Sequence, residues 1–172
     1  QELRTGFPTT LPNYVMGRTL WDKSLTYEEL EKEYFTAAFG KEGMTVAAYL
    51  EKLSNLSSSD YFNKIGSRIN AQLAAQYQGC VSEAVAILLV VIKGLKDSQA
   101  SQHENWRVLA YHRQAVIKLA TALGLQASGK QAKAEEAWID FQDFIKLHEA
   151  NFEPYLDVYR IIEVATNYAG FK

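Results

Sequence analysis

The stretch HENWRVLAYHRQAVIKLATALGLQASG, residues 103–129, decides the fold class of this chain. Its apolar residues recur at steps of three and four, which is the spacing that places side chains on one face of an α-helix. No proline interrupts the stretch, and Ser128 and Gly129 follow as a break. We predict a long helix over about 103–127, with an apolar side formed by Trp106, Leu109, Ala110, Val116, Ile117, Ala120 and Leu123.

The rest of the chain has the same helical character. Its three prolines are Pro8, Pro12 and Pro154, so the interior contains none, which favours helix. After a loop over residues 1–12 we expect helices over about 12–21, 26–39, 43–55, 60–76, 81–96, 130–149 and 154–168, with Gly66 and Gly79 as interruptions and Tyr159 among the buried residues of the last helix. Short connections favour antiparallel neighbours. The predicted fold class is therefore all-α, an up-and-down antiparallel helical bundle after about residue 60.

Composition excludes some classes of function. The chain has 172 residues, of which 48% are hydrophobic, so it is long enough to form a core. Its net charge is −2, and Lys and Arg are interspersed with Asp and Glu. Nucleic-acid-binding domains usually carry a basic face. We therefore predict no nucleic-acid partner.

The single cysteine and the longest apolar run both suggest burial. Cys80 cannot form a disulfide within the chain, and its small and apolar neighbours indicate a buried thiol. The run Ala84–Ile92 is shorter than the roughly 20 residues that span a bilayer. We predict a buried helix there and no membrane span.

The residues that usually carry catalysis lack the required spacing. None of His103, His112 and His148 has a Glu three residues before it, so the di-metal bundle motif is missing, and no His-Glu-x-x-His string occurs. No Gly-x-Ser-x-Gly elbow or phosphate-binding glycine loop is present. The acidic residues of 28–33 and the pair at 135–136 lie on helices with an apolar opposite face, which is typical of a solvated surface. We predict no catalytic residues, no metal and no cofactor in this chain.

A junction near the N-terminus carries more information. Leu20 and Trp21 end the first predicted helix, and we expect them to form a large apolar anchor. Asp22 can accept backbone donors in the following turn, and Thr26 with Glu29 forms a capping box for the next helix. The local sequence therefore predicts a fixed angle between two helices.

The residues from Arg18 to Leu30, followed by Glu33-Tyr34-Phe35 and Phe39-Gly40, resemble a junction in bacterial TIM-barrel glycosidases. There the last barrel helix passes into a C-terminal helical domain. The sequence is most similar to family 4838 of the domains of unknown function, and α-glucuronidases have a similar junction. The resemblance extends more weakly to 105–125, 129–145 and 153–162.

This resemblance implies a division of the chain and a set of partners. Residues 1–22 would be the end of an upstream barrel (loop plus last helix), and 23–172 a C-terminal helical domain. The acid and base carboxylates would lie in that barrel, which is the implied partner within the same polypeptide. A periplasmic or extracellular location, a glycan bound through the barrel and a homodimer are further implications.

Two residues are candidates for substrate binding in an intact protein of this kind. Loops that follow barrel strands line the active-site face, so Arg4 and Asn13 could approach a glycan cleft. The structural alternative is that Arg4 pairs with a neighbouring acid. At the level of function, the leading hypothesis is an accessory domain that braces the barrel, shapes its rim or mediates dimerisation. The alternative is a free-standing helical module that binds another protein.

Overall fold

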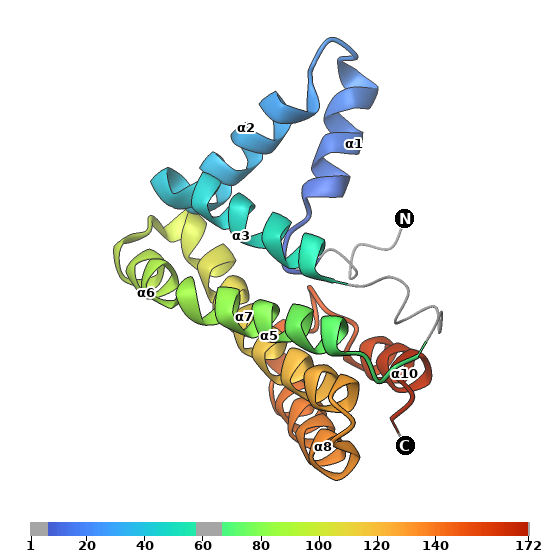
Figure 1. The fold of residues 1–172 in the computed structure, drawn as a ribbon. Coiled ribbons are helices and arrows are strands. Elements are labelled where there is room, and N and C mark those ends of the chain that lie inside the picture. Colours follow the sequence, from blue (N-terminus) through green and yellow to red (C-terminus); the bar gives the residue numbers. More distant parts are fainter. Residues whose placement is uncertain (1–6, 58–66, 172) are drawn as a thin grey trace.

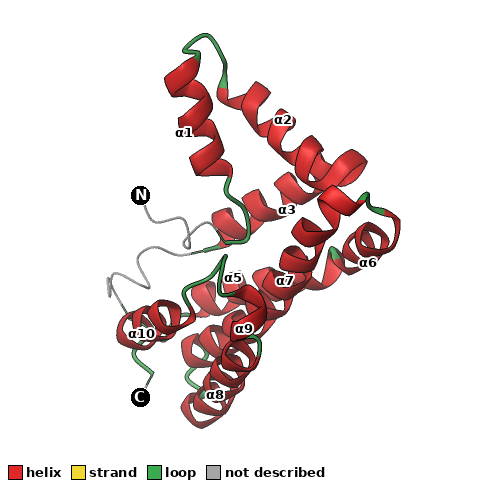
Figure 2. Ribbon diagram, turned by 180° about the vertical axis from the view of Figure 1, so that it is seen from behind, coloured by secondary structure: helices red, strands yellow, loops and turns green. Residues whose placement is uncertain are grey.

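The computed structural model describes residues 7–57 and 67–171, and within these ranges the chain is helical with connecting turns and has no strand (Figures 1 and 2). The all-α helical bundle predicted from the sequence is confirmed. The helices in chain order are α1 (Leu11–Trp21), α2 (Tyr27–Phe39), the 3₁₀ turn η2 (Gly40–Glu42), α3 (Gly43–Leu56), α5 (Ala71–Ala86), α6 (Leu88–Asp97), α7 (Ala100–Ala127), α8 (Gln131–Leu147), α9 (Glu149–Phe152) and α10 (Val158–Ala169).

The central element is α7, the helix predicted from residues 103–127. It lies between α5 and α8 and is antiparallel to both. Asn70 N donates to Ala127 O at 2.9 Å, and the Arg113 guanidinium donates to Ala84 O at 3.2 Å, which sets the register with α5. The Lys118 Nζ–Asp140 Oδ2 pair, at 2.6 Å, joins α7 to α8. These three helices form the body of the molecule.

A second layer covers one side of this body. The helix α3 runs antiparallel to α5, with the ion pair Lys52–Glu83 at 3.2 Å. Glu42 of the preceding 3₁₀ turn η2 pairs with Lys93 of α6 at 3.1 Å. The end of α2 meets the start of α7, where the Gln102 amide donates to Ala37 O at 3.2 Å. The α1–α2 hairpin therefore projects from the body at the end where α7 begins (Figure 1).

The C-terminal residues close the other end of the core. Tyr111 of α7 stacks on Phe152 of α9 with ring centroids 3.8 Å apart. Trp138 of α8 stacks on Phe171 at 4.8 Å. The Arg68 guanidinium donates to Ala169 O, which ties the chain before α5 to the end of α10. All four of these aromatic residues are buried, so the C-terminal turn belongs to the core.

Some predicted helix boundaries are wrong. Residues 60–66 of the helix expected over 60–76 lie outside the described residues. Residues 67–70 are not helical, because Asn70 caps α5 by accepting from Gln72 N at 2.8 Å and Leu73 N at 3.2 Å. Gly79 does not interrupt the helix. It packs against Leu56, whose methyl carbons would lie 3.1 and 3.2 Å from an added Cβ. The interruption falls instead at Ile87, between α5 and α6.

The last helix also starts later than predicted. Asp157 Oδ1 accepts from Arg160 N at 2.9 Å and caps α10, while Pro154 remains in the preceding turn. This register places Val158 and Ala165 in the core. Tyr159, predicted to be buried, is 79% exposed.

Candidate interaction surface

The turn between α1 and α2 is built by local hydrogen bonds. Asp22 Oδ1 accepts from Ser24 N at 2.9 Å and from Ser24 Oγ at 2.7 Å, and these bonds lower the pKa of the Asp22 carboxyl. Thr26 Oγ1 accepts from Glu29 N at 3.3 Å, while Thr26 N donates back to Glu29 Oε2 at 3.0 Å. The predicted capping box is therefore confirmed, and it fixes where α2 begins.

A polar contact holds α1 against α2. The Arg18 guanidinium donates to Glu33 Oε1 and, at 2.7 Å, to Tyr14 Oη. Hydrogen bonds from Tyr14 and Arg18 lower the pKa of the Glu33 carboxyl. Nearer the body, Thr10 N donates to Tyr34 Oη at 2.9 Å. Exposed contacts of this kind contribute little stability each.

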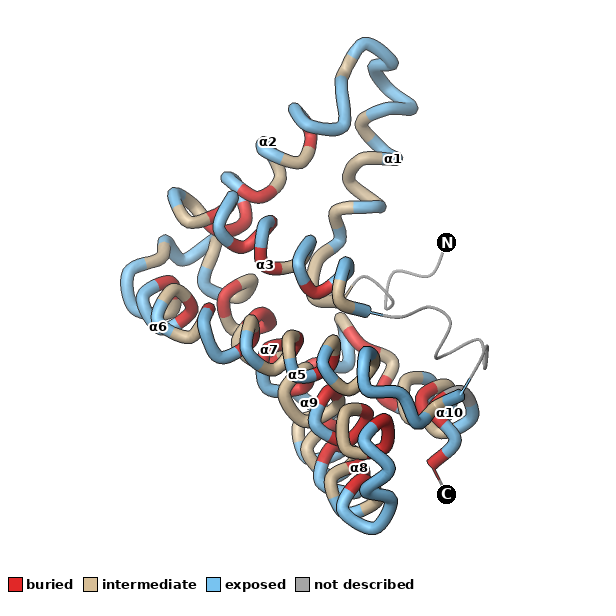
Figure 3. Tube along the Cα trace, in the orientation of Figure 1, coloured by how far each residue is buried: buried red, intermediate tan, exposed pale blue. Residues whose placement is uncertain are grey.

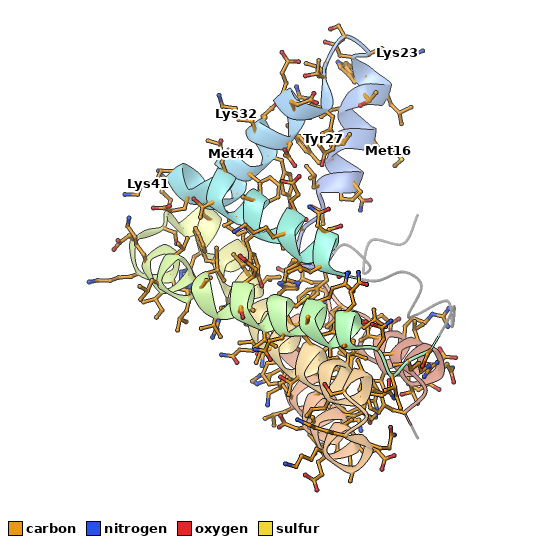
Figure 4. The ribbon with its side chains drawn as sticks, viewed as in Figure 1. Met16, Lys23, Tyr27, Lys32, Lys41 and Met44 are labelled. Carbon is orange, nitrogen blue, oxygen red and sulfur yellow. The ribbon has the colours of Figure 1, made fainter. Side chains whose placement is uncertain are left out.

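Several apolar side chains of the hairpin are exposed. No residue of α1 is buried (Figure 3). We define the hairpin surface as Met16, Leu20, Trp21 and Tyr27, which are 49, 77, 92 and 52% exposed. No other described element covers Leu20 and Trp21 at this end of α1, so the expected anchor stays a prediction. Figure 4 shows Met16 and Tyr27 on the hairpin, with Lys23 at its tip.

The described structure contains only one of the two candidate glycan-binding residues, so it does not show whether they lie together. Arg4 lies outside the described residues. Asn13 lies in the first turns of α1 and is partly buried. It is separated from Trp21 by eight residues, about 12 Å along the helix axis. A role for Asn13 and Arg4 in a glycan cleft stays a prediction.

The histidines are dispersed over the described fold. His103 lies in the first turn of α7 and His148 at the end of α8, where its ring is 4.9 Å from that of Phe144. His112 faces Phe7 and Tyr49, and burial lowers its pKa to about 4. No group of three or more His, Cys, Asp or Glu side chains within residues 7–57 and 67–171 is arranged to hold a metal ion.

The burial predicted for Cys80 is confirmed, and the burial predicted for the apolar run Ala84–Ile92 is found for only some of its residues. Cys80 is a buried free thiol, as predicted, and burial raises its pKa. The run expected to be buried has Ala84, Ile87 and Val91 inside, whereas Val85, Leu89 and Ile92 are 54, 77 and 50% exposed.

The same region bears on the question of a membrane span. In the described chain, the helical stretch Ala71–Asp97 is long and apolar enough to cross a membrane by length and composition, and 28% of its most apolar window is buried. Core helices of soluble proteins pass the same test, so one such stretch is weak evidence. The absence of a membrane span stays a prediction.

Comparisons with protein-family models, with curated proteins and with solved structures find no match to this chain. The resemblance at residues 18–30 therefore stays a prediction. The fold and the surface define a class only: an all-α helical bundle with a projecting hairpin that exposes Met16, Leu20, Trp21 and Tyr27.

Proposed function

We propose that this chain is a non-catalytic helical accessory domain of a glycoside hydrolase-like protein, and that it docks on the barrel of that protein through the hairpin surface. The observation that carries the proposal is Trp21, which is 92% exposed at the end of a helix with no buried residue. Its place in the Trp21-Asp22 junction agrees with the sequence resemblance. Bracing the barrel would be its main role.

The physical argument starts from the cost of leaving this surface in water. A large aromatic side chain buries roughly 150–250 Å² when it is covered, which makes tryptophan a preferred anchor of protein interfaces. Leu20 and Trp21 are adjacent at the end of α1, and Met16 is one helical turn before Leu20. The turn and the capping box hold α1 and α2 in a defined geometry, so little ordering would be needed on docking.

The complete reading frame that contains this chain is the first test. The accessory role requires a segment upstream of Gln1 that encodes strands alternating with helices and carries paired carboxylates. A frame without such a segment refutes the accessory role. In that case the second candidate, a free-standing module that binds another protein through the same surface, is favoured by the same exposure of Trp21.

A footprinting experiment tests the docking itself. Hydroxyl-radical oxidation of Trp21, followed by mass spectrometry of its peptide, would be compared between the 172-residue chain and the complete protein. We expect several-fold slower oxidation in the complete protein. Tyr159, 79% exposed on α10, is the matched control and should react equally in both. Equal rates at Trp21 in the two proteins would refute docking through this surface.

A further inference from the structure

A cavity of about 400 Å³ lies where the segment before α1 meets α3, α5 and α7. Its wall includes Pro8 from the N-terminal segment, Leu53 from α3, Cys80 from α5, and His112 and Val116 from α7. Binding sites for small molecules commonly measure about 300–1,000 Å³ and are lined mainly by apolar groups with a few polar ones. This cavity has that size and composition, and none of the residues of the hairpin surface lines it.

The chemistry of the wall is almost entirely uncharged. Among the described residues that line the cavity there is no Lys, Arg, Asp or Glu. Burying an ion without a partner is very unfavourable, so the wall selects against charged ligands. The polar side chains of the wall are those of Thr9, Ser54, Ser57, Tyr77 and His112, and the other described residues that line it are Cys80 and apolar residues.

His112 supplies the imidazole of this wall. Its ring is held edge-on between Phe7, with centroids 5.4 Å apart, and Tyr49, at 6.1 Å. Its Nδ1 is shielded from solvent and has no hydrogen-bond partner within the described chain. Burial lowers the pKa of this imidazole to about 4, so the ring is neutral near pH 7. A neutral imidazole can accept one hydrogen bond and donate another.

We propose that this cavity binds a small, uncharged, mainly apolar molecule with one hydroxyl group, which hydrogen-bonds to His112. The apolar part of the molecule would lie against Leu53 and Val116. Because Nδ1 has almost no solvent-accessible surface in the described chain, the ring would turn slightly towards the cavity to meet the hydroxyl, and the bond would satisfy a costly unpaired nitrogen. The proposal does not depend on docking of the hairpin surface.

The probes for this proposal are 1-octanol, octanoate and octylammonium, which share one chain and differ in the polar group. Binding would be measured by isothermal titration calorimetry at pH 7. The single cysteine gives a second readout, because Cys80 lines the cavity and a bound ligand should slow its reaction with N-ethylmaleimide. We expect saturable binding of octanol, with octanoate and octylammonium at least about tenfold weaker because their charges would be buried.

Three variants locate the site. Val116→Phe fills the cavity and should abolish octanol binding and the protection of Cys80. Val85→Phe, the same substitution at a residue that is 54% exposed and outside the cavity wall, is the matched control and should bind like the wild type. His112→Phe keeps a ring but removes the hydrogen bond, so octanol should bind several-fold more weakly.

Three results would overturn the proposal. They are no saturable binding of octanol to the wild type, equal binding of octanol and octanoate, and unchanged binding in folded Val116→Phe. If Val116→Phe does not fold, which circular dichroism would reveal, the comparison of the three probes on the wild type decides alone.

Discussion

Replacing Gly94 with alanine should destabilise the protein, although alanine is the better helix former. Gly94 lies within α6 and faces the ring of Trp106, which is 1% exposed. A Cβ added at Gly94 would lie 2.2, 2.3 and 2.4 Å from three atoms of that ring. The ring has little room to move, because Phe39 meets it edge-on with centroids 5.0 Å apart.

Two opposing terms determine the size of the effect. Alanine in a helix interior is favoured over glycine by about 1 kcal/mol. Against this, the Trp106 ring would have to retreat by roughly 1 Å to reach an ordinary contact, and overpacking of a core costs typically about 1–3 kcal/mol, occasionally more. The clash involves three ring atoms of a fully buried residue, so we place the cost at or above the top of that range. The net loss for Gly94→Ala should then be about 2 kcal/mol or more.

Urea unfolding followed by circular dichroism measures this difference. Gly17→Ala is the matched control, since Gly17 also lies in a helix interior but an added Cβ there meets nothing within 4 Å. The control should stabilise α1 by about 0.5–1 kcal/mol if its unfolding is coupled to that of the body. A Gly94→Ala protein as stable as the wild type, or more so, would refute the close packing of α6 on Trp106.

Three further predictions concern pH, capping and tryptophan burial. The pKa of His112 is about 4 in the folded chain and about 6.5 when unfolded, so its contribution to stability is complete above pH 6.5 and is lost as the pH falls towards 4. Between pH 7 and pH 4 the free energy of unfolding of the wild type, measured by urea titration, should fall by roughly 3 kcal/mol because of this group. The His112→Phe variant should lack this part of the loss, and equal losses in both proteins would contradict the lowered pKa of His112. Asn70→Ala removes the cap of α5 and should lower the free energy of unfolding by about 1 kcal/mol, whereas no change would argue against the start of α5 at residue 71. In the 172-residue chain, Trp21→Ala should change stability by less than about 0.5 kcal/mol, while Trp138→Ala should cost about 3–5 kcal/mol, and similar values for the two would contradict their different burial.

Where local chemistry decides, the sequence was a good guide. The Thr26–Glu29 capping box and the helix ends at Gly40 and Gly129 follow from residues within one turn. Both glycines have positive φ, 66° and 74°, which other residues adopt at a cost. Cys80 was also predicted correctly, because its small and apolar neighbours indicate burial.

Several predictions that depend on packing between helices were wrong. Gly79 was expected to break a helix, yet its missing side chain lets α5 lie close to Leu56 of α3. No glycine or proline lies at the break at Ile87, so nothing in the sequence signals it. Tyr159 fits the apolar period of α10. Its side chain is nevertheless exposed, because α10 begins at the Asp157 cap and meets the core with another side.

The two candidate sites differ in the same respect. The sequence singled out Trp21 as a large apolar residue at a helix end, but whether it is covered depends on what packs against α1. For His112 it indicated only that the spacing of a di-metal motif is missing, and the cavity arises because α3, α5, α7 and the N-terminal segment converge there. No spacing within one helix encodes such a convergence.

The sequence by itself therefore determined the helices, most of their ends and the all-α class, because backbone hydrogen bonding, caps and apolar periodicity act within a few residues. The tertiary structure alone decided that Trp21 is exposed, that Gly94 receives the ring of Trp106, and that an uncharged cavity forms around His112. The physical reason is that burial belongs to the contact between elements. A side chain leaves water only when another part of the chain, distant in sequence, covers it.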